Sequence, residues 1–246
     1  MTANLVTAKI RLFVNHPFEA AQSIALDRDQ ANYLFAVMRL SVGDQILVFN
    51  GRDGEWLADI TSGSKRGGVL QLVTQTKPLQ APPDLWLMFA PIKKARTDFI
   101  VEKATELGAA EIFPISTDYT NSERIRQDRL QAHAVEATEQ CGGTYVPVVH
   151  DLQSLDKCLQ TWPQDRNILF CDETLVGQAP TDLASCPAGK WAIFIGPEGG
   201  FSPAERARLQ SHPQSHSISL GPRILRADTA AVSALTLWQR SLGDWT

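Results

Sequence analysis

The feature that most constrains this chain is an alternation, from residue 85 onward, of short apolar runs with stretches of helical periodicity. The apolar runs lie at residues 85–90, 111–115, 167–171, 191–195 and 217–220. Helices are predicted at residues 97–107, 123–140, 203–210 and 229–242, with Gly108 ending the first and Ser122 as the N-cap of the second. This alternation predicts an α/β fold with a mostly parallel sheet covered on both faces. Such sheets bind ligands in the loops after the carboxyl ends of their strands.

The first 76 residues have a different pattern. Strand-like runs at 11–14, 45–50, 55–60 and 69–74 surround one helical stretch at 29–40, with turn-forming pairs at Asn50-Gly51, Asp53-Gly54 and Gly67-Gly68. Short strands joined by tight turns predict a compact β-barrel. Because the proline-containing segment 77–83 is typical of a stiff connector, we predict a small domain at 1–76, a linker at 77–83 and a larger domain at 84–246.

The composition excludes several classes of protein. With 43% hydrophobic and 20% charged residues, the chain is typical of globular proteins. It has no run of about 18 apolar residues that would span a membrane, and its N-terminus lacks the pattern of a secretory signal. The net charge of −4 argues against binding nucleic acid through bulk charge, but not against a local basic patch.

No metal site or disulfide is expected. His212 and His216 are four residues apart, but Pro213 between them would disrupt a helix. The four cysteines form no C-x-x-C pair, and scattered cysteines are typical of buried thiols in a reducing compartment. They are Cys141, Cys158, Cys171 and Cys186. We therefore expect a cytoplasmic protein.

A glycine-rich loop at 196–201 follows the apolar run 191–195. Ser202, Pro203 and Glu205 then provide the N-cap, first turn and capping box of a helix. Glycines in such a loop let backbone amides approach a ligand closely. The loop lacks the lysine of a Walker A motif and the spacing of a dinucleotide fingerprint, which favours a ligand without a phosphate chain.

A second loop at 221–226 follows the run 217–220. It contains Arg223 and Arg226 and is followed by Asp228. Arginine suits a phosphate or a developing anion, and a structural ion pair with Asp228 is the alternative.

Taken in order, several short stretches resemble the SPOUT class of methyltransferases, and within it the RsmE family, which methylates N3 of a uridine in small-subunit ribosomal RNA. They span nearly the whole chain. The stretches are 38–40 with Gly43-Asp44, 103–108, 139–142, 195–202 with Glu205, and 220–226 with Thr229-Ala230. The chain departs from the family's usual pattern at Asp228, where a glutamate is usual, and at Gly143, where an arginine is common.

The resemblance implies a trefoil-knotted SPOUT domain, a PUA-like RNA-binding barrel at the N-terminus, a homodimer, S-adenosylmethionine (SAM) as cofactor and 16S ribosomal RNA of the small subunit as substrate. It implies that Arg226 stabilises negative charge on the uracil, while Glu198 or Asp228 accepts a proton or orients the arginine. The implied cofactor-binding residues are Phe170, Ile195, Gly196, Pro197, Gly199, Gly200, Leu220, Gly221, Ile224, Leu225 and Thr229. The candidate RNA-binding cations are Arg11, Arg39, Lys93, Lys94, Arg96, Arg124, Arg126 and Arg129.

Two alternatives stay open. One is ribose 2′-O methylation, as in the related SpoU branch, whose third motif contains an asparagine where this chain has residues 226–229. The other is a non-enzymatic RNA-binding or ribosome-assembly factor, which would not need a cofactor pocket. Nucleotide hydrolysis is disfavoured because the chain lacks a phosphate-binding lysine and a metal-binding carboxylate pair.

Overall fold

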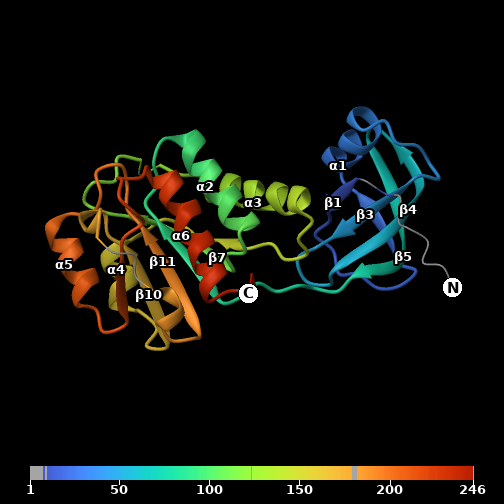
Figure 1. Cartoon of the computed structure of the whole chain (residues 1–246). Coiled ribbons are helices and arrows are strands. Elements are labelled where there is room, and N and C mark those ends of the chain that lie inside the picture. The colour runs from blue at the N-terminus through green and yellow to red at the C-terminus, as the bar shows by residue number, and fades with distance from the viewer. Residues whose placement is uncertain (1–7, 9, 123, 179–181, 246) are drawn as a thin grey trace. The chain divides into compact units, whose positions relative to one another are not determined.

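The structure is a computed structural model that describes residues 8, 10–122, 124–178 and 182–245. Its contacts divide the chain into two compact units (Figure 1). The first comprises Met1–Ala81 and Thr138–Val146, and the second comprises Pro82–Ala137 and Pro147–Thr246. In the described part of the chain, no helix is both long and apolar enough to cross a bilayer.

The first unit contains a five-stranded sheet in the order β1-β3-β4-β5-β2. β1 and β3 are parallel, and the other neighbours are antiparallel. The elements are β1 (Arg11–Phe13), β2 (Ser23–Leu26), α1 (Arg28–Asn32), the π-helical turn η1 (Tyr33–Val37), β3 (Gln45–Phe49), β4 (Glu55–Ser64) and β5 (Gly67–Lys77). The four strands expected from the sequence are present, and β2 was not predicted.

Two sequence predictions in this unit were wrong in detail. The predicted helix at 29–40 is a short α-helix that continues as a π-helical turn. The pair Gly67-Gly68 begins β5, and the turn falls at Lys65-Arg66. The glycines serve packing instead, because a Cβ at Gly68 would lie 2.8 Å from the Ser62 carbonyl oxygen and 3.0 Å from the Phe35 ring.

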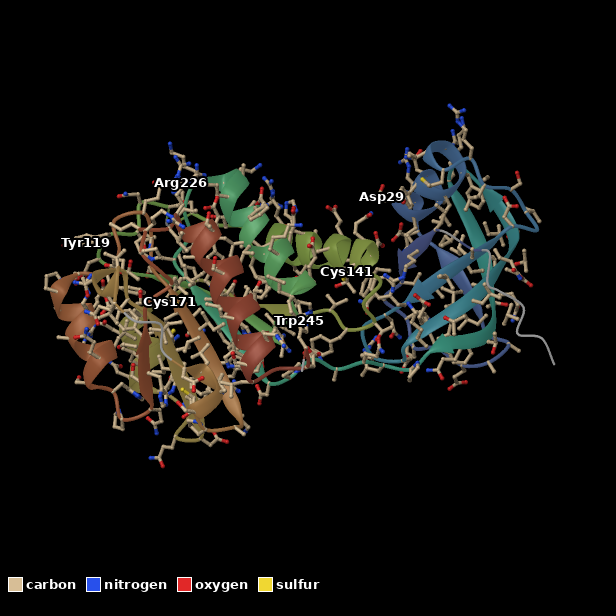
Figure 2. All side chains as sticks on the ribbon, viewed as in Figure 1. Asp29, Tyr119, Cys141, Cys171, Arg226 and Trp245 are labelled. Atoms are coloured by element: carbon tan, nitrogen blue, oxygen red, sulfur yellow. The ribbon has the colours of Figure 1, made fainter. Side chains whose placement is uncertain are left out.

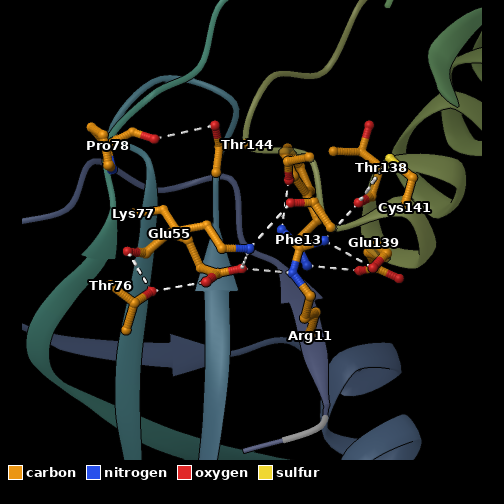
Figure 3. A network of polar contacts seen from close by, with 12 residues as sticks. Arg11, Phe13, Glu55, Thr76, Lys77, Pro78, Thr138, Glu139, Cys141 and Thr144 are labelled. Atoms are coloured by element: carbon orange, nitrogen blue, oxygen red, sulfur yellow. Dashed lines mark hydrogen bonds and ion pairs between the residues drawn. The ribbon is translucent and has the colours of Figure 1, made fainter. Parts of the chain in front are cut away.

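Arg11 joins β1 to the segment 138–146 within this unit (Figure 3). Its Nε donates to Glu55 Oε2 at 2.7 Å, and its Nη atoms donate to the carbonyl oxygens of Thr138, Glu139 and Gly143 at 2.6–2.8 Å. The Glu55 side chain is 2% exposed and that of Arg11 is 11% exposed. A helix leaves its last carbonyls without partners, and here one guanidinium satisfies two of those at the end of α3 (Gln127–Cys141), Thr138 and Glu139.

The second unit contains a parallel sheet of seven strands in the order β12-β10-β11-β6-β7-β8, with β9 beside β7. The strands are β6 (Leu85–Phe89), β7 (Glu111–Ser116), β8 (Val148–Val149), β9 (Gln153–Ser154), β10 (Arg166–Cys171), β11 (Lys190–Ile195) and β12 (Ser215–Ile218). The helices are α2 (Lys94–Glu106), α3, α4 (Leu155–Gln160), the 3₁₀ turns η2 (Glu173–Leu175) and η3 (Leu183–Ser185), α5 (Pro203–Ser211) and α6 (Ala227–Ser241).

Alternate residues of these strands are buried on opposite faces of the sheet. Leu87 and Ile193 belong to one apolar cluster with Leu235 of α6. Phe194, the next residue along β11, belongs to another cluster with Leu209 of α5. Each such side chain contributes about 1.5–3 kcal/mol when fully buried. The prediction of a parallel sheet covered on both faces is thus confirmed.

The boundaries of the helices predicted from residue 85 onward agree with the structure within two residues, except that α2 begins three residues earlier and α3 four residues later than predicted, and α4 was not predicted. Gly108 has a φ of +77°, as expected after a helix end, and Ser202 and Glu205 form the predicted capping box. Ser122 is not an N-cap, because α3 begins at Gln127 and the Arg126 carbonyl accepts the first helical hydrogen bonds. Ile125 instead packs against the apolar core.

We predict that Arg11→Ala lowers the free energy of unfolding of the first unit by about 3 kcal/mol, because it leaves the buried Glu55 carboxylate without its main partner. Arg11→Lys should restore only part of this, since an ammonium cannot reproduce the forked geometry. Urea unfolding followed by circular dichroism measures the effect. The exposed Arg52→Ala is the control, with an expected change below about 0.5 kcal/mol, and equal stability of the Arg11 and Arg52 variants would contradict the prediction.

Candidate functional site

Three loops meet at the carboxyl edge of the sheet, because β12, β10 and β11 are neighbours and parallel. They enclose a cavity with about 610 Å³ of atom-free space, part of it open to solvent. The lining comes from Cys171, Asp172, Glu173 and Val176 after β10, Ile195, Gly196, Pro197, Glu198 and Gly200 after β11, Ser219, Leu220, Gly221, Arg223, Ile224 and Leu225 after β12, and Ala227 and Ala230 of α6.

The loop after β11 needs its glycines for steric reasons. Gly200 has a φ of +70°, and a Cβ there would collide with the Glu173 carboxylate. A Cβ at Gly196 would lie 2.9 Å from the Phe201 ring. Gly196 and Gly200 are therefore packed too closely for a side chain, which leaves their peptide groups at the cavity wall.

The capping box at the start of α5 also contacts the loop after β7, which does not line the cavity. Ser202 Oγ donates to Asp118 Oδ2 at 2.5 Å, and the Asp118 backbone N–H donates to Glu205 Oε1 at 2.8 Å. Glu205 is 3% exposed. Buried hydrogen bonds to a carboxylate are among the stronger ones, so the loop after β7 is held against the start of α5.

Arg206 of α5 ties together the loops after β10 and β11. Its guanidinium pairs with Glu173, lies 3.3 Å from Asp172 Oδ1, and donates to the Phe201 carbonyl oxygen at 3.3 Å. The Asp172 side chain is fully buried and also accepts from Gln210 Nε2 at 2.8 Å. Nothing in the sequence indicates this role for Arg206, because arginines on exposed helix faces follow the same pattern.

Arg96 of α2 contacts both carboxylates proposed for the chemistry. Its Nη1 lies 3.7 Å from Glu198 Oε1, and its Nε lies 3.7 Å from Asp228 Oδ2. The Asp228 side chain is 20% exposed and that of Glu198 is 53% exposed. Arg226, at the N-cap position of α6, is exposed and does not line the cavity (Figure 2). Glu198 and Asp228, which come from two loops distant in sequence, thus lie in one cluster with Arg96, which the sequence analysis proposed to bind RNA.

Most residues expected to hold the cofactor line the cavity, and three do not. Phe170 is fully buried, with its ring 5.3 Å from that of Phe201 on the α5 side of the sheet. Gly199 lies against Tyr119, and Thr229 is exposed on α6. The residues that line the cavity as expected are Ile195, Gly196, Pro197, Gly200, Leu220, Gly221, Ile224 and Leu225.

The sequence reasoning did not name the lining residues Cys171, Asp172, Glu173, Val176, Ser219, Ala227 and Ala230, and it named Arg223 only as a residue suited to a phosphate or a developing anion. A usable signal was present after β10, where an apolar run ends directly in two carboxylates. Ala227 and Ala230 carry no signal of their own, because alanine is equally common inside any helix.

The candidate RNA-binding cations differ in their partners. The prediction that Arg11 binds RNA is corrected, because its guanidinium is occupied by Glu55 and three backbone carbonyls. Arg126 pairs with Asp128 at 2.5 Å and Arg129 with Asp98 at 2.6 Å. Of these candidates, Arg39, Lys93, Lys94 and Arg124 are exposed and form no ion pair among the described residues. No cluster of three metal-ligating side chains was found in the described part of the chain.

Comparison with known proteins adds to this geometry. A family model described as an RNA methyltransferase domain matches residues 79–239, and one described as an RNA methyltransferase PUA domain matches 26–73. The ribosomal RNA small subunit methyltransferase E of Rickettsia conorii is 31% identical over 92% of this chain and 93% of its own. That of Bacillus subtilis is 27% identical over 89% of this chain and 90% of its own.

Two solved structures share the fold over nearly their whole length. The Neisseria gonorrhoeae ribosomal RNA small subunit methyltransferase E, bound to SAM, has a TM-score of 0.87 and 24% identity, covering 96% of this chain and 99% of its own. A Legionella pneumophila protein in complex with SAM has a TM-score of 0.85 and 26% identity, covering 96% and 98%. The predicted fold class, a trefoil-knotted SPOUT domain with an N-terminal PUA-like β-barrel, is confirmed.

A parallel sheet with a cavity among its strand-end loops, combined with a PUA-like barrel, defines an RNA methyltransferase of the SPOUT class. The chain belongs to the ribosomal RNA small subunit methyltransferase E family. This membership decides against the alternative of a non-enzymatic RNA-binding factor.

The reactivity of Cys171 tests whether its thiol is buried in the wall of the cavity. Burial raises the pKa of its thiol, whereas Cys141 is exposed. Because the thiolate is the reactive form and a raised pKa reduces its population at a given pH, we predict that iodoacetamide at pH 7.5 labels Cys141 and leaves Cys171 unlabelled (Figure 2). Peptide mass spectrometry measures both rates, and labelling in urea shows that Cys171 can react. Similar rates in the folded protein would contradict the prediction.

Proposed function

We propose that this chain transfers a methyl group from SAM to N3 of a uridine in 16S ribosomal RNA, acting in the cytoplasm as a homodimer on the small subunit. The observation that carries the proposal is the cavity enclosed by the loops after β10, β11 and β12, with the Arg96–Glu198–Asp228 cluster at two of those loops. The names of the relatives described above support the choice of substrate.

The lining of the cavity fits SAM. Val176, Leu220 and Ile224 offer apolar surface for an adenine ring, and the glycine-rich loop offers backbone groups for its polar edge. Glu198 suits the positive charges of the cofactor, and Arg223 suits its carboxylate. The residues proposed to hold it are the lining residues of the three loops, and Phe170, Gly199 and Thr229 are left out of this set.

When bound, SAM supplies a methyl group on a positively charged sulfur, which makes that methyl electrophilic. Uracil N3 carries a proton and is a poor nucleophile until the proton leaves. The chain must therefore accept the N3 proton and stabilise the negative charge that spreads onto the uracil oxygens. Positioned charges of this kind are a large source of catalysis, and correct alignment of N3 contributes further.

The contacts favour different roles for the two carboxylates. Asp228 Oδ1 accepts the Thr229 backbone N–H at 2.9 Å, and its Oδ2 faces Arg96. This suits Asp228 to orient Arg96. The aspartate reaches Arg96 although its side chain is shorter than that of the usual glutamate. Glu198 is more exposed, and its ion pair among the described residues is with Arg96, which suits it to accept the N3 proton. Arg226 is proposed to stabilise the uracil anion.

The cofactor assignment predicts that Gly200→Ala weakens SAM binding at least tenfold. The backbone at Gly200 has a positive φ, which costs a residue with a side chain about 1–2 kcal/mol, and the new Cβ collides with Glu173. Titration calorimetry with SAM measures the dissociation constant. Gly43→Ala is the matched control, since Gly43 has a φ of +97° and open space around it. Unchanged affinity of the Gly200 variant would place SAM elsewhere.

The catalytic assignment predicts that Arg226→Ala lowers kcat by about 100-fold, as expected for loss of a group that stabilises developing charge, while the SAM dissociation constant stays unchanged. Methyl transfer to unmodified small subunits measures the rate. Arg240→Ala, at the other end of α6, should behave like the parent chain. Wild-type turnover of the Arg226 variant would refute its role.

Nucleoside mass spectrometry of the product tests the reaction itself. The expected product is N3-methyluridine in 16S RNA. Detection of 2′-O-methyluridine would replace the proposal with ribose methylation. If no methylated nucleoside forms with any small-subunit RNA, the proposal is refuted.

A further inference from the structure

A second hollow lies between the first turns of α2 and α3, outside the cavity described above. It has about 550 Å³ of atom-free space, part of it open to solvent. Lys94, Thr97 and Asp98 line it from α2, and Arg126, Arg129 and Leu130 line it from the start of α3. In both sets the residues follow the spacing i, i+3, i+4, which puts them on one face of a helix.

The hollow has an apolar floor and a cationic rim. Ile92 and Leu130 are buried and form the floor with the half-buried Ile125. The cations of the rim are Lys94, Arg124, Arg126 and Arg129. An apolar surface bordered by positive charge suits a ligand that joins a flat apolar ring to an anion.

Two of the four cations have no anionic partner among the described residues. Arg129 is neutralised by Asp98, which also lines the hollow, at 2.6 Å, and Arg126 pairs with the exposed Asp128. Lys94 and Arg124 are exposed and form no ion pair in the part of the chain that the structure describes. Their charge is therefore available to a ligand, although the chain as a whole has a net charge of −4.

The first turn of α2 borders both the hollow and the proposed reaction site. Lys94 lines the hollow, and Arg96, two residues later, contacts Glu198 and Asp228. Residues two apart on a helix point in different directions, and one turn of helix rises only about 5.4 Å. A chain molecule with one unit at the Glu198–Asp228 cluster can thus reach the hollow with a neighbouring unit.

We propose that the hollow binds the nucleotide next to the target uridine, with its base against Ile92, Ile125 and Leu130 and its phosphate between Lys94 and Arg124. The inference rests on the proposed function. Base methylation requires the target base to leave its stack, which also unstacks its neighbour. Proteins bind such splayed nucleotides by covering the base and pairing cations with the phosphate.

The double variant Lys94→Gln, Arg124→Gln tests the phosphate contacts. With unmodified small subunits as substrate, its KM for RNA should rise about tenfold, while the SAM dissociation constant stays unchanged. With a fluorescein-labelled U12 oligonucleotide, the plot of log affinity against log salt should lose about 0.7 in slope, because the one phosphate held between the two cations contributes about 0.7 on single-stranded nucleic acid. Fluorescence anisotropy between about 50 and 200 mM salt measures it.

A second variant separates occupancy of the hollow from general attraction by charge. Ser122 lines the hollow and is half-buried, so Ser122→Trp fills the space and keeps every charge. It should also raise KM for RNA. The matched control for charge is Lys157→Gln, Arg240→Gln, which removes two cations from the same unit on α4 and at the far end of α6. The control should keep the KM and the salt slope of the parent chain.

The outcomes separate the two proposals. If the parent chain methylates RNA and the Lys94/Arg124 variant keeps both the KM and the salt slope, the hollow is not an RNA site and the inference is overturned. It is also overturned if the Lys157/Arg240 control loses as much slope as the test variant. If the parent chain methylates no RNA, the proposed function fails, and the U12 slopes still decide whether the hollow binds RNA.

Discussion

β10 pairs with both β11 and β12, and every part of the candidate site depends on this position in the sheet. Leu169 lies opposite Ile193 on one side and His216 on the other. A slip of one residue in either pairing would turn buried side chains to the wrong face. The two-sided burial of the sheet therefore fixes the register, and the register brings the loops after three strands together at one edge. Without it, Glu173, Gly200 and Leu220 would not share a cavity.

The fold was largely predictable because its signals are local. Apolar runs of five or six residues identified β6, β7, β10 and β11 within a residue or two, and the Ser202–Glu205 capping box located the start of α5. The start of α3 could not be read in this way, since Ser122 has the composition of an N-cap and only the packing of Ile125 against the core decides otherwise. The two-residue strands β8 and β9 and the short β2 carry too few residues for a periodicity.

The loops that form the candidate site could be predicted from the sequence, but the ion pairs between their residues could not. The sequence marks Glu198, Asp228 and Arg96 as charged residues near strand ends, yet nothing in it joins Arg96 to the other two, which are more than 100 residues away. Arg11 and Arg96 both read as free cations, and the structure commits one to a buried network and the other to the proposed reaction cluster. Long-range ion pairs depend on tertiary geometry and cannot be read from the sequence. Lys94 and Arg124, by contrast with Arg11 and Arg96, have no ion-pair partner among the described residues. Which cations are available to bind a nucleic acid is thus known only once the ion pairs of the folded chain are known.

The Arg11 network also changes what counts as the N-terminal domain. Three of the four groups that receive hydrogen bonds from its guanidinium come from Thr138, Glu139 and Gly143, far along the chain. The first unit is therefore discontinuous in sequence, and a fragment that stops at Ala81 lacks part of its own interior. Exchange of this unit between relatives would have to carry two separate segments together, because a graft of the first segment alone would leave a buried arginine facing foreign backbone.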